Sequence, residues 1–221
     1  MDNLVQRIDL EIERRSLLKH KFYRLWLEGK LDLNHLKGYS SEYFQLVKAV
    51  PLMVDNVLSY CTKDMPLRSA LQENHREEIE HIELWAKFSA NMGIKSDQLV
   101  DYVSAEATNN AVSLLMKLTK LSLGQGAAAM YAYEKQLPEI SRSKIDGLKN
   151  HYRIVNNAGA TEYFEVHEKV DIKHAAVWKS ILDKAYDVRP DSLVQAAIES
   201  LRAQNRLLDS VYERYIEPVS S

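Results

Sequence analysis

The chain is poor in the residues that make turns, disulfides and thiolate metal clusters. Its 221 residues include only 7 Gly, 5 Pro and 1 Cys. All-β architectures need frequent turns, so the scarcity of Gly and Pro argues against them. With Cys61 alone, an internal disulfide framework and a thiolate metal cluster are both excluded. A reducing cytoplasm is therefore the expected location.

A large charge of either sign and long apolar runs are also missing. Lys plus Arg is 29 and Asp plus Glu is 31, which gives a formal net charge of −2. Nucleic acids and anionic membranes attract basic proteins, so this balance argues against both as partners. No apolar run approaches the roughly 18 residues that a membrane span needs. The polar start of the chain is unlike a secretory signal.

Apolar residues recur at helical spacing along almost the whole chain, and hydrophobic residues make up 46% of it. The spacing predicts helices over residues 4–29, 32–60, 66–91, 96–106, 110–121, 127–149, 161–186 and 191–215. Asp32 is the expected N-cap of the second helix, and Pro51 and Pro138 are expected inside helices. A polar turn is expected at residues 156–159. Without repeats or flexible linkers, residues 1–221 are expected to form one all-α domain, a bundle of about seven helices.

The stretch from His167 to His174 carries the strongest chemical signal. His167, Asp171 and His174 stand at positions i, i+4 and i+7, which lie along one face of a helix. Phe164 and Trp178 continue that face with apolar side chains, so the face is expected to point inward. Buried imidazoles and carboxylates are costly unless they are paired or metal-bound, and iron or manganese accepts such ligands. The pattern favours a metal site over a solvated polar stripe.

Two further segments supply carboxylates and an imidazole. Glu78 and His81 form the Glu-x-x-His pair that dinuclear carboxylate bundles use, and Glu77 is also well spaced to act with His81. Glu134 follows a run of small residues, which allows close helix packing and indicates a deep position. Three carboxylates and three imidazoles are thus predicted to hold two metal ions: Glu78 (or Glu77), His81, Glu134, His167, Asp171 and His174.

The remaining histidines and the cysteine have plainer predicted roles. His20 is considered as a haem ligand, but a His between Lys19 and Lys21 is more often solvent-facing. Cys61 is expected to be a buried or inert thiol. Three histidines in polar surroundings are expected to have no role: His35, His75 and His151.

Taken together, these motifs resemble the CADD-like proteins, named after the chlamydial protein associating with death domains. These proteins are haem-oxygenase-like di-metal oxidases, more distantly related to the TenA and PqqC proteins. The resemblance covers nearly the whole chain. One departure is that the Glu and His of the third helix stand about two turns apart in the chlamydial protein and one turn apart here. The segments that carry the resemblance are Phe22-Tyr23-Arg-Leu-Trp26, Tyr39-Ser-Ser-Glu-Tyr43, Lys48-Ala-Val-Pro51, His81-Ile-Glu-Leu-Trp85, Tyr133-Glu134-Lys-Gln-Leu-Pro138, Ser143-Lys144-Ile-Asp-Gly147 and His167-x3-Asp171-x2-His174.

The resemblance implies an Fe/Fe or Fe/Mn centre that uses O2 and a reductant to make p-aminobenzoate for folate synthesis from the protein's own side chains. Tyr23 matches the tyrosine that is cleaved from the backbone and becomes the aromatic ring. Lys144, ten residues after Glu134, matches the lysine that supplies the nitrogen. The relatives also imply a homodimer and an electron donor as partner. Four more tyrosines are expected beside the metals, where they relay electrons or position the ring: Tyr39, Tyr43, Tyr133 and Tyr163.

Residue pattern alone gives Tyr23 and Lys144 ordinary roles. A Tyr between Phe22 and Trp26 is most often a core residue, and a Lys after Ser-Arg-Ser is most often exposed. If Lys144 is instead buried near the site, its pKa should fall and leave a free amine that can attack a carbon.

Four other functions can be compared with the sequence. A di-metal oxidase acting on an external amine, fatty acid or amino acid would use the same ligands for many turnovers. TenA-type hydrolysis needs a catalytic Cys at a position that Cys61 does not match, and the full ligand set disfavours cofactor-free oxidation of the PqqC type. A protein-interaction module, suggested by the name of the chlamydial relative, would leave the ligand set without a purpose.

Overall fold

The structure, a computed structural model, describes residues 3–152, 154, 159–184 and 189–217, and within these ranges it contains helices and no strands. Residues 156–158 of the expected polar turn and Tyr186 at the expected end of the seventh helix lie outside the described residues. The elements in chain order are α1 (Leu4–Arg14), the 3₁₀ helix η1 (Leu17–Lys19), α2 (Lys21–Leu27), α3 (Leu33–Leu58), α4 (Met65–Ala90), α5 (Ser96–Val100), α6 (Glu106–Thr119), α7 (Leu123–Glu134), α8 (Leu137–Gly147), the π-helical turn η2 (Leu148–Tyr152), α9 (Glu162–Asp183), α10 (Pro190–Val211) and the π-helical turn η3 (Tyr212–Ile216).

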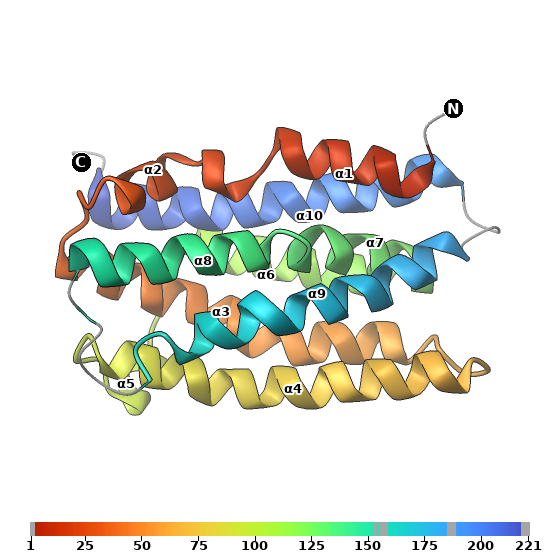
Figure 1. The fold of residues 1–221 in the computed structure, drawn as a ribbon, viewed down its shortest axis with the longest axis horizontal. Helices are drawn as coiled ribbons and strands as arrows, with labels where there is room; N and C mark the ends of the chain where they lie inside the picture. The colour runs from red at the N-terminus through yellow and green to blue at the C-terminus, as the bar shows by residue number, and fades with distance from the viewer. Residues whose placement is uncertain (1–2, 153, 155–158, 185–188, 218–221) are drawn as a thin grey trace.

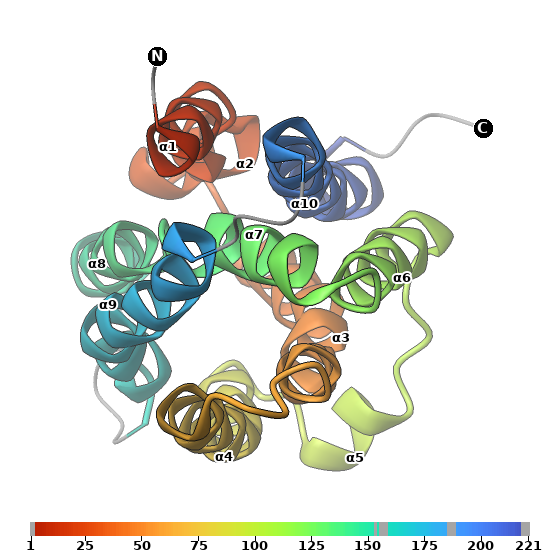
Figure 2. The ribbon, with the colours of Figure 1, turned by 90° about the vertical axis from the view of Figure 1, so that its right-hand side faces the viewer.

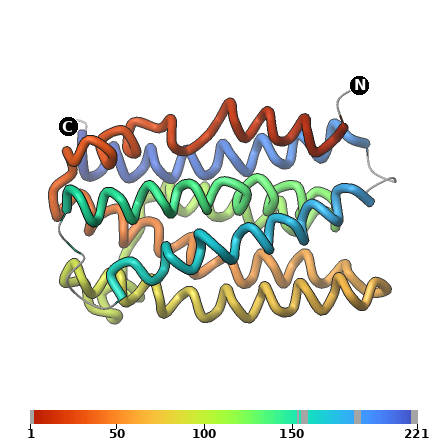
Figure 3. The backbone as a smooth tube through the Cα atoms, in the orientation of Figure 1, coloured from red at the N-terminus to blue at the C-terminus, as the bar shows by residue number. Residues whose placement is uncertain are grey.

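The long helices run side by side along one axis (Figure 1). The smooth backbone trace in Figure 3 follows the same course from the N-terminal α1 to the C-terminal α10. Viewed from the end, α7 lies between α10 on one side and α3 and α9 on the other, while α4 packs against α3 and α9 (Figure 2). The helices α3, α4, α7 and α9 therefore surround one central space. No helix of the described part of the chain is long and apolar enough to cross a membrane.

The close approach of α7 to its neighbours depends on its small residues. Ala127, Ala128 and Ala129 are all buried. A Cβ atom added to Gly126 would lie 2.7 Å from Cγ2 of Val57 and 3.2 Å from the carbonyl oxygen of Thr119, so only glycine fits there. This packing places the C-terminal end of α7 deep in the bundle, as the run of small residues predicted.

The start of α3 follows the sequence prediction. Asp32 is its N-cap, and Oδ1 of Asp32 accepts hydrogen bonds from the backbone N–H groups of Asn34 and His35. Nδ1 of His35 accepts a hydrogen bond from the backbone N–H of Asp32 and completes a capping box. The expectation that His35 has no role is therefore wrong, because its ring helps to start α3, which has 26 residues. Pro51 lies inside α3, as predicted.

The prediction of one continuous helix over residues 4–29 is wrong, because the helix is interrupted at residues 15–20. The Ser16 side chain accepts the backbone N–H of Leu18, and Nδ1 of His20 accepts the backbone N–H of Phe22. Each of these two side chains caps the start of a new helix. Their hydrogen bonds compete with those of a continuous helix. His20 is also not solvent-facing: its side chain is 7% exposed, and Nε2 lies 3.0 Å from Oδ1 of Asp209. Both ring nitrogens are thus engaged, which disfavours haem ligation.

Two more boundaries differ from the prediction for local reasons. The expected helix over residues 127–149 is divided, because Pro138 lies in the first turn of α8 instead of inside a helix. Proline lacks the N–H that an inner helical position needs, and the first turn does not use it. The expected helix over 96–106 ends at Val100, and the next one begins at Glu106 instead of 110.

Candidate metal centre and the aromatic chamber beside it

The helix α9 presents the His-Asp-His face inward, as its spacing predicted. His167, Asp171 and His174 are 2%, 0% and 1% exposed. The apolar residues that continue this face, Phe164 and Trp178, are buried as well. Packing of α9 against α4, α7 and α8 encloses the three polar groups. The alternative of a solvated polar stripe is excluded.

On α4, Glu78 and His81 face the same space and are 5% and 3% exposed. Oε2 of Glu78 lies 3.3 Å from Nδ1 of His81, and Oε1 of Glu78 lies 3.5 Å from Nδ1 of His174. The two oxygens of one carboxylate thus point to imidazoles on two different helices. Glu78 would therefore be able to bind metal together with imidazoles from α4 and α9.

The third contribution comes from Glu134 at the end of α7, which is 0% exposed. The indole Nε1 of Trp178 donates a 2.6 Å hydrogen bond to Oε2 of Glu134, and the same oxygen lies 3.8 Å from Nδ1 of His174. The structure therefore brings together all six residues of the predicted set. We refer to them as the carboxylate–imidazole cluster: Glu78, His81, Glu134, His167, Asp171 and His174.

The ligand atoms of this cluster form two overlapping trios. Glu78 with His81 and His167 is one trio, and Glu78 with Asp171 and His174 is the other. Within each trio, one ligand atom per residue lies within 4.8 Å of the others. Two trios that share one carboxylate suit a pair of ions with a bridging ligand.

Unpartnered polar atoms show that a cation fits this space. The following buried atoms have no hydrogen-bond partner among the described residues: Nδ1 of His81 and of His174, Oε1 of Glu134, and both carboxylate oxygens of Asp171. An unsatisfied buried polar group costs about 1–3 kcal/mol. Metal ions in the two trios would satisfy these atoms and offset the carboxylate charges.

Burial and mutual contact shift the proton affinities within the cluster. Burial raises the pKa of Glu134 and of Asp171, whereas the nearby imidazoles of His174 and His81 overcome burial and lower the pKa of Glu78. Burial lowers the pKa of His174, but the nearby carboxylates of Asp171 and Glu78 raise it more, to about 11. A metal ion at Nδ1 of His174 would have to displace a proton, so we expect metal uptake to release protons.

The geometry distinguishes between Glu77 and Glu78, which the sequence left as alternative metal ligands. Glu77 is partly exposed, and its Oε2 lies 2.6 Å from Nε2 of His174, on the far side of the ring from the cluster. Lys173 also approaches Glu77, at 3.7 Å. Carboxylates placed in this way orient a metal-binding histidine and fix its tautomer. The structure favours Glu78 as the ligand and Glu77 as the group that orients His174.

Lys144 on α8 lies next to the cluster in an apolar setting. Its side chain is 2% exposed, and Nζ has no hydrogen-bond partner among the described residues. Nζ lies 3.8 Å from the ring centroid of Tyr39, 4.4 Å from that of Trp26 and 4.9 Å from that of Tyr23. Burial lowers the pKa of Lys144 well below its usual value, as the sequence-based argument required for a lysine near the site. We call this region the aromatic chamber, formed by Lys144 with Phe22, Tyr23, Trp26, Tyr39 and Phe164.

A series of aromatic rings connects the aromatic chamber to the cluster. The ring centroids of Tyr39 and Tyr43 are 5.3 Å apart, and those of Tyr43 and Trp85 are 5.0 Å apart. Trp85 lies 4.7 Å from Tyr163, which stacks on His167 at 3.9 Å. The four tyrosines expected beside the metals are all buried: Tyr39, Tyr43, Tyr133 and Tyr163.

A small internal cavity lies between the aromatic chamber and the cluster. Its lining includes Tyr39, Tyr43, Lys144, Tyr163 and His167, and its volume is about 10 Å³. A cavity of this size holds about one water molecule. It has no room for an aromatic substrate.

The sequence-based argument missed Asn74, which lies on α4 one turn before Glu78. Asn74 is 1% exposed, and neither atom of its side-chain amide has a hydrogen-bond partner among the described residues. Residues 74, 78 and 81 repeat the i, i+4, i+7 spacing of the His-Asp-His face on α9. That repeated spacing is the signal that could have identified Asn74 as a further polar group on the inward face.

Comparison with known proteins agrees with the class that this fold and cluster define. Residues 38–206 match the family described as iron-containing redox enzymes. The chain belongs to this family, and it is an enzyme of the oxidoreductase type. Its buried His, Glu and Asp residues give it a site that could bind metal.

More particular relatives fit the same picture. The 4-aminobenzoate synthase of Chlamydia pneumoniae is 32% identical to this chain over 207 residues, which cover 91% of each chain. A protein from Shewanella denitrificans with a haem-oxygenase-like fold superposes with a TM-score of 0.76 at 19% identity, covering 96% of this chain and 91% of the other. A CADD-like protein of unknown function from Nostoc punctiforme gives a TM-score of 0.74 at 15% identity, covering 97% of each chain. The all-α, haem-oxygenase-like fold and the CADD-like resemblance are thus confirmed.

Proposed function

We propose that this protein makes 4-aminobenzoate from one of its own tyrosine side chains, with the nitrogen of Lys144. The observation that carries the proposal is an unpartnered, buried amine among tyrosine rings, one small cavity away from the carboxylate–imidazole cluster. The name of the chlamydial relative, 4-aminobenzoate synthase, supports the same product.

The carbon skeleton of the product is already present in tyrosine. A tyrosine side chain has a six-carbon ring with Cβ and the hydroxyl at para positions, and 4-aminobenzoate has a carboxyl carbon and an amino group at para positions. The Cα–Cβ bond breaks and Cβ is oxidised to the carboxyl carbon. Nζ of Lys144 bonds to the ring carbon in place of the phenolic oxygen, which leaves as water. Oxidation of Cε and hydrolysis then break the Cε–Nζ bond, so that the amino group leaves with the product and an aldehyde remains at Cε. O2 is the oxidant, and an external reductant supplies the electrons that the oxidation of Cβ and Cε does not.

Lys144 is suited to supply that nitrogen because it is buried without a charged partner. A neutral amine keeps a lone pair and can attack a carbon, whereas an ammonium group cannot. Burial lowers the pKa of Lys144 and thereby favours the neutral form. The space beside Lys144 holds no more than about one water molecule that could compete for the same carbon.

Two metal ions, Fe/Fe or Fe/Mn, would be held by the six residues of the carboxylate–imidazole cluster. Bound there, they would supply the activation of O2 that the oxidation of a tyrosine requires. Glu77 would hold the ring of His174 in place, and Tyr43, Tyr133 and Tyr163 would carry electrons between the cluster and the aromatic chamber. Metal identity, O2 use and the role of each residue are parts of the proposal.

The distances add Tyr39 as a second candidate for the ring that is consumed. The family resemblance assigns this role to Tyr23, but Nζ of Lys144 lies closer to the centroid of Tyr39, at 3.8 Å against 4.9 Å. Tyr39 also lies next to Tyr43 of the aromatic series, with 5.3 Å between the ring centroids. We retain Tyr23 as the primary candidate and let the experiment separate the two.

An oxidase acting on an external small molecule is the second candidate function, and the cavity size argues against it. An external amine, fatty acid or amino acid would need far more than the volume of about 10 Å³ between the cluster and the aromatic chamber. A separate pocket of about 300 Å³ is lined by Asp171 but by no other residue of the cluster and by none of the aromatic chamber. Cys61, the one residue that could suggest TenA-type hydrolysis, is buried and does not line the cavity. The homodimer, the electron donor and the cytoplasmic location remain predictions.

The test uses protein labelled in its own side chains. We would prepare metal-free protein with ring-¹³C tyrosine and ε-¹⁵N lysine, add iron, manganese, O2 and a reductant together with unlabelled free tyrosine and lysine, and analyse the product by mass spectrometry. The proposal expects 4-aminobenzoate carrying both labels, with no more than one product molecule per chain. An unlabelled product or many turnovers would support the external-substrate alternative.

Two matched variants identify the tyrosine. Tyr23→Phe is expected to abolish the product and Tyr39→Phe to reduce it, since Tyr39 then acts only in positioning and electron transfer. Intact-mass measurement should show the loss of the Tyr23 side chain after exposure to O2. Full yield from Tyr23→Phe with none from Tyr39→Phe would move the assignment to Tyr39.

A further inference from the structure

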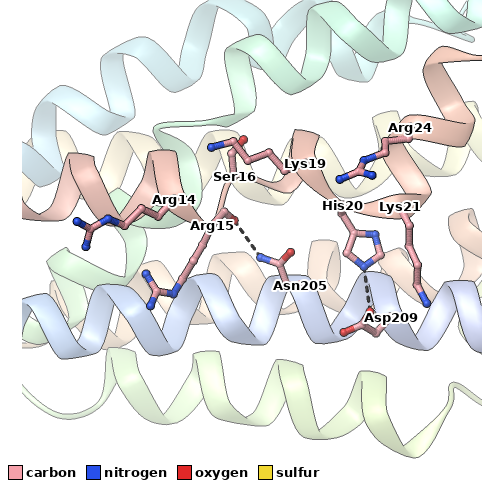
Figure 4. Close-up of a pocket in the computed structure, with 9 residues that line it drawn as sticks. All are labelled: Arg14, Arg15, Ser16, Lys19, His20, Lys21, Arg24, Asn205 and Asp209. Carbon is pink, nitrogen blue, oxygen red and sulfur yellow. Dashed lines mark hydrogen bonds and ion pairs between the residues drawn. The ribbon is translucent and has the colours of Figure 1, made fainter.

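A second candidate site lies on the outer side of the bundle, where residues 15–20 interrupt the helix between α1 and α2 (Figure 4). It is an open pocket of about 360 Å³, and it contains no residue of the carboxylate–imidazole cluster or the aromatic chamber. Asn205 and Asp209 of α10 form its floor. The cationic residues that line it are Arg14, Arg15, Lys19, Lys21 and Arg24.

The pocket is positive although the chain as a whole is not. Residues 14–24 contain five Lys and Arg and no acidic residue. Asp209 is the one carboxylate that lines the pocket, and Arg14 and Arg15 both pair with Glu11 beside it. Five cations minus two carboxylates leave a local charge of +3 with His20 neutral, against −2 for the whole chain.

The other three cations have no carboxylate partner among the described residues. Nζ of Lys19 donates a 2.6 Å hydrogen bond to the backbone oxygen of Glu13, which is neutral. Nζ of Lys21 lies 3.7 Å above the centroid of the Tyr212 ring. Arg24 lies on α2, and its guanidinium points toward residues 15–20 (Figure 4). These charges remain available to an anion that enters the pocket.

Two contacts hold the floor of the pocket in place, and both are visible in Figure 4. Nε2 of His20 lies 3.0 Å from Oδ1 of Asp209, and Nδ2 of Asn205 donates a 3.0 Å hydrogen bond to the backbone oxygen of Arg15. They hold residues 15–20 against α10. A fixed floor reduces the ordering cost of binding.

We propose that this pocket binds a phosphate-bearing small molecule. Arginine forks match phosphate oxygens in paired hydrogen bonds, and a dianionic or more highly charged phosphate balances the local charge of the pocket. The volume is within the range of small-molecule sites, about 300–1,000 Å³. The site goes beyond the proposed function, and its ligand would bind on the outer side of α2, opposite the buried Tyr23.

The test is calorimetric titration of the full-length protein with inorganic pyrophosphate at low ionic strength. Saturable binding is expected, and it should weaken as salt is added. Arg24→Gln and Lys19→Gln should each weaken binding about tenfold, the loss expected for one charge-assisted contact. Lys87→Gln is the matched control, because it removes one positive charge on α4, on the opposite side of the bundle.

Absence of saturable pyrophosphate binding would overturn the proposal, and so would equal weakening by Lys87→Gln, which would indicate a diffuse charge effect. Metal content measured on the same preparations should be unchanged in Lys19→Gln. Failure of 4-aminobenzoate formation would leave the binding result as it stands, so the two proposals can fail separately.

Discussion

The carboxylate–imidazole cluster and the aromatic chamber are neighbours with equal burial and opposite chemistry. The cluster contains acids close to bases, such as Glu78 beside His81 and His174, so opposite charges can offset one another. The aromatic chamber contains one basic group, Lys144, whose Nζ has no hydrogen-bond partner among the described residues. Opposite charges can therefore offset one another in one region, whereas burial favours a neutral amine in the other. The same helical bundle can hold cations in the cluster and a nucleophile in the neighbouring chamber.

The largest effect should come from the residue shared by both trios. Glu78→Gln removes the carboxylate that faces His81 and His174, so we expect both metal ions to be lost and product formation with them. Asp171→Asn removes a ligand from one trio only and should leave one ion per chain. Elemental analysis after dialysis gives the stoichiometry, with circular dichroism to confirm helix content. Equal metal content in the two variants would contradict a shared bridging position for Glu78.

Lys144→Met should separate the two regions, because it changes the aromatic chamber and leaves every metal ligand in place. We expect full metal content, no 4-aminobenzoate, and a free energy of unfolding higher by about 1–4 kcal/mol at pH 7, since an unpartnered buried amine is replaced by an apolar side chain. Chemical denaturation measures the stability, and the labelled-product assay measures the yield.

The gain in stability should depend on pH. The pKa of Lys144 is lowered in the folded chain relative to its ordinary 10.5, so the unfolded chain binds the extra proton below pH 10.5. The destabilising effect of Lys144 is therefore present at neutral pH and fades as the pH rises toward 10.5. Lys149→Met, at an exposed lysine nearby, should show neither the gain nor the pH dependence. A constant difference between wild type and Lys144→Met across this range would refute the lowered pKa.

A smaller effect is expected from Glu77, which touches the cluster from outside. Glu77→Gln weakens the contact to Nε2 of His174 and should lower metal affinity about 10- to 100-fold without removing the site. Competition with a chelator measures the affinity. Glu80→Gln is the control, since Glu80 is exposed on the same helix. If both variants bind metal as the wild type does, Glu77 does not orient His174.

The smallest effect should come from a buried hydrogen bond outside both regions. The hydroxyls of Ser40 and Ser89 lie 2.6 Å apart between α3 and α4, and Ser89 also donates to the backbone oxygen of Trp85. Ser40→Ala should lower the free energy of unfolding by about 1 kcal/mol and leave metal content and product unchanged. A loss of metal from this variant would show that the cluster depends on the whole α3–α4 contact.

The convergence of the six cluster residues could be predicted from the sequence because most of its signals are local. The spacing of His167, Asp171 and His174 places them on one face, and the small residues before Glu134 indicate a deep position. The choice between Glu77 and Glu78 is not local, since the two are adjacent on α4 and only the docking of α9 decides which one faces the cluster.

Other features depend on contacts between distant segments. The sequence around Lys144 is polar, and its burial results from the packing of α8 against α2 and α9. The interruption of the helix before α2 depends on His20, whose ring caps α2 and contacts Asp209 on α10. The apolar spacing continues across this interruption, so periodicity alone predicts one helix instead of α1 and α2. The carboxylate–imidazole cluster was therefore easier to predict than the boundaries of the helices near the aromatic chamber.

The near absence of free space around Tyr23 has a consequence for the fate of the protein after the proposed reaction. Excising this ring, which is 1% exposed and packs edge-on against Phe22, would leave a hole that the rigid helices could fill only in part. Removal of a buried aromatic side chain costs about 3–5 kcal/mol, a large share of the stability of an ordinary domain. A chain that has lost the Tyr23 side chain would thus be less stable and would also be unable to react again. The protein would behave as a stoichiometric reagent, and its rate of synthesis would limit the supply of product.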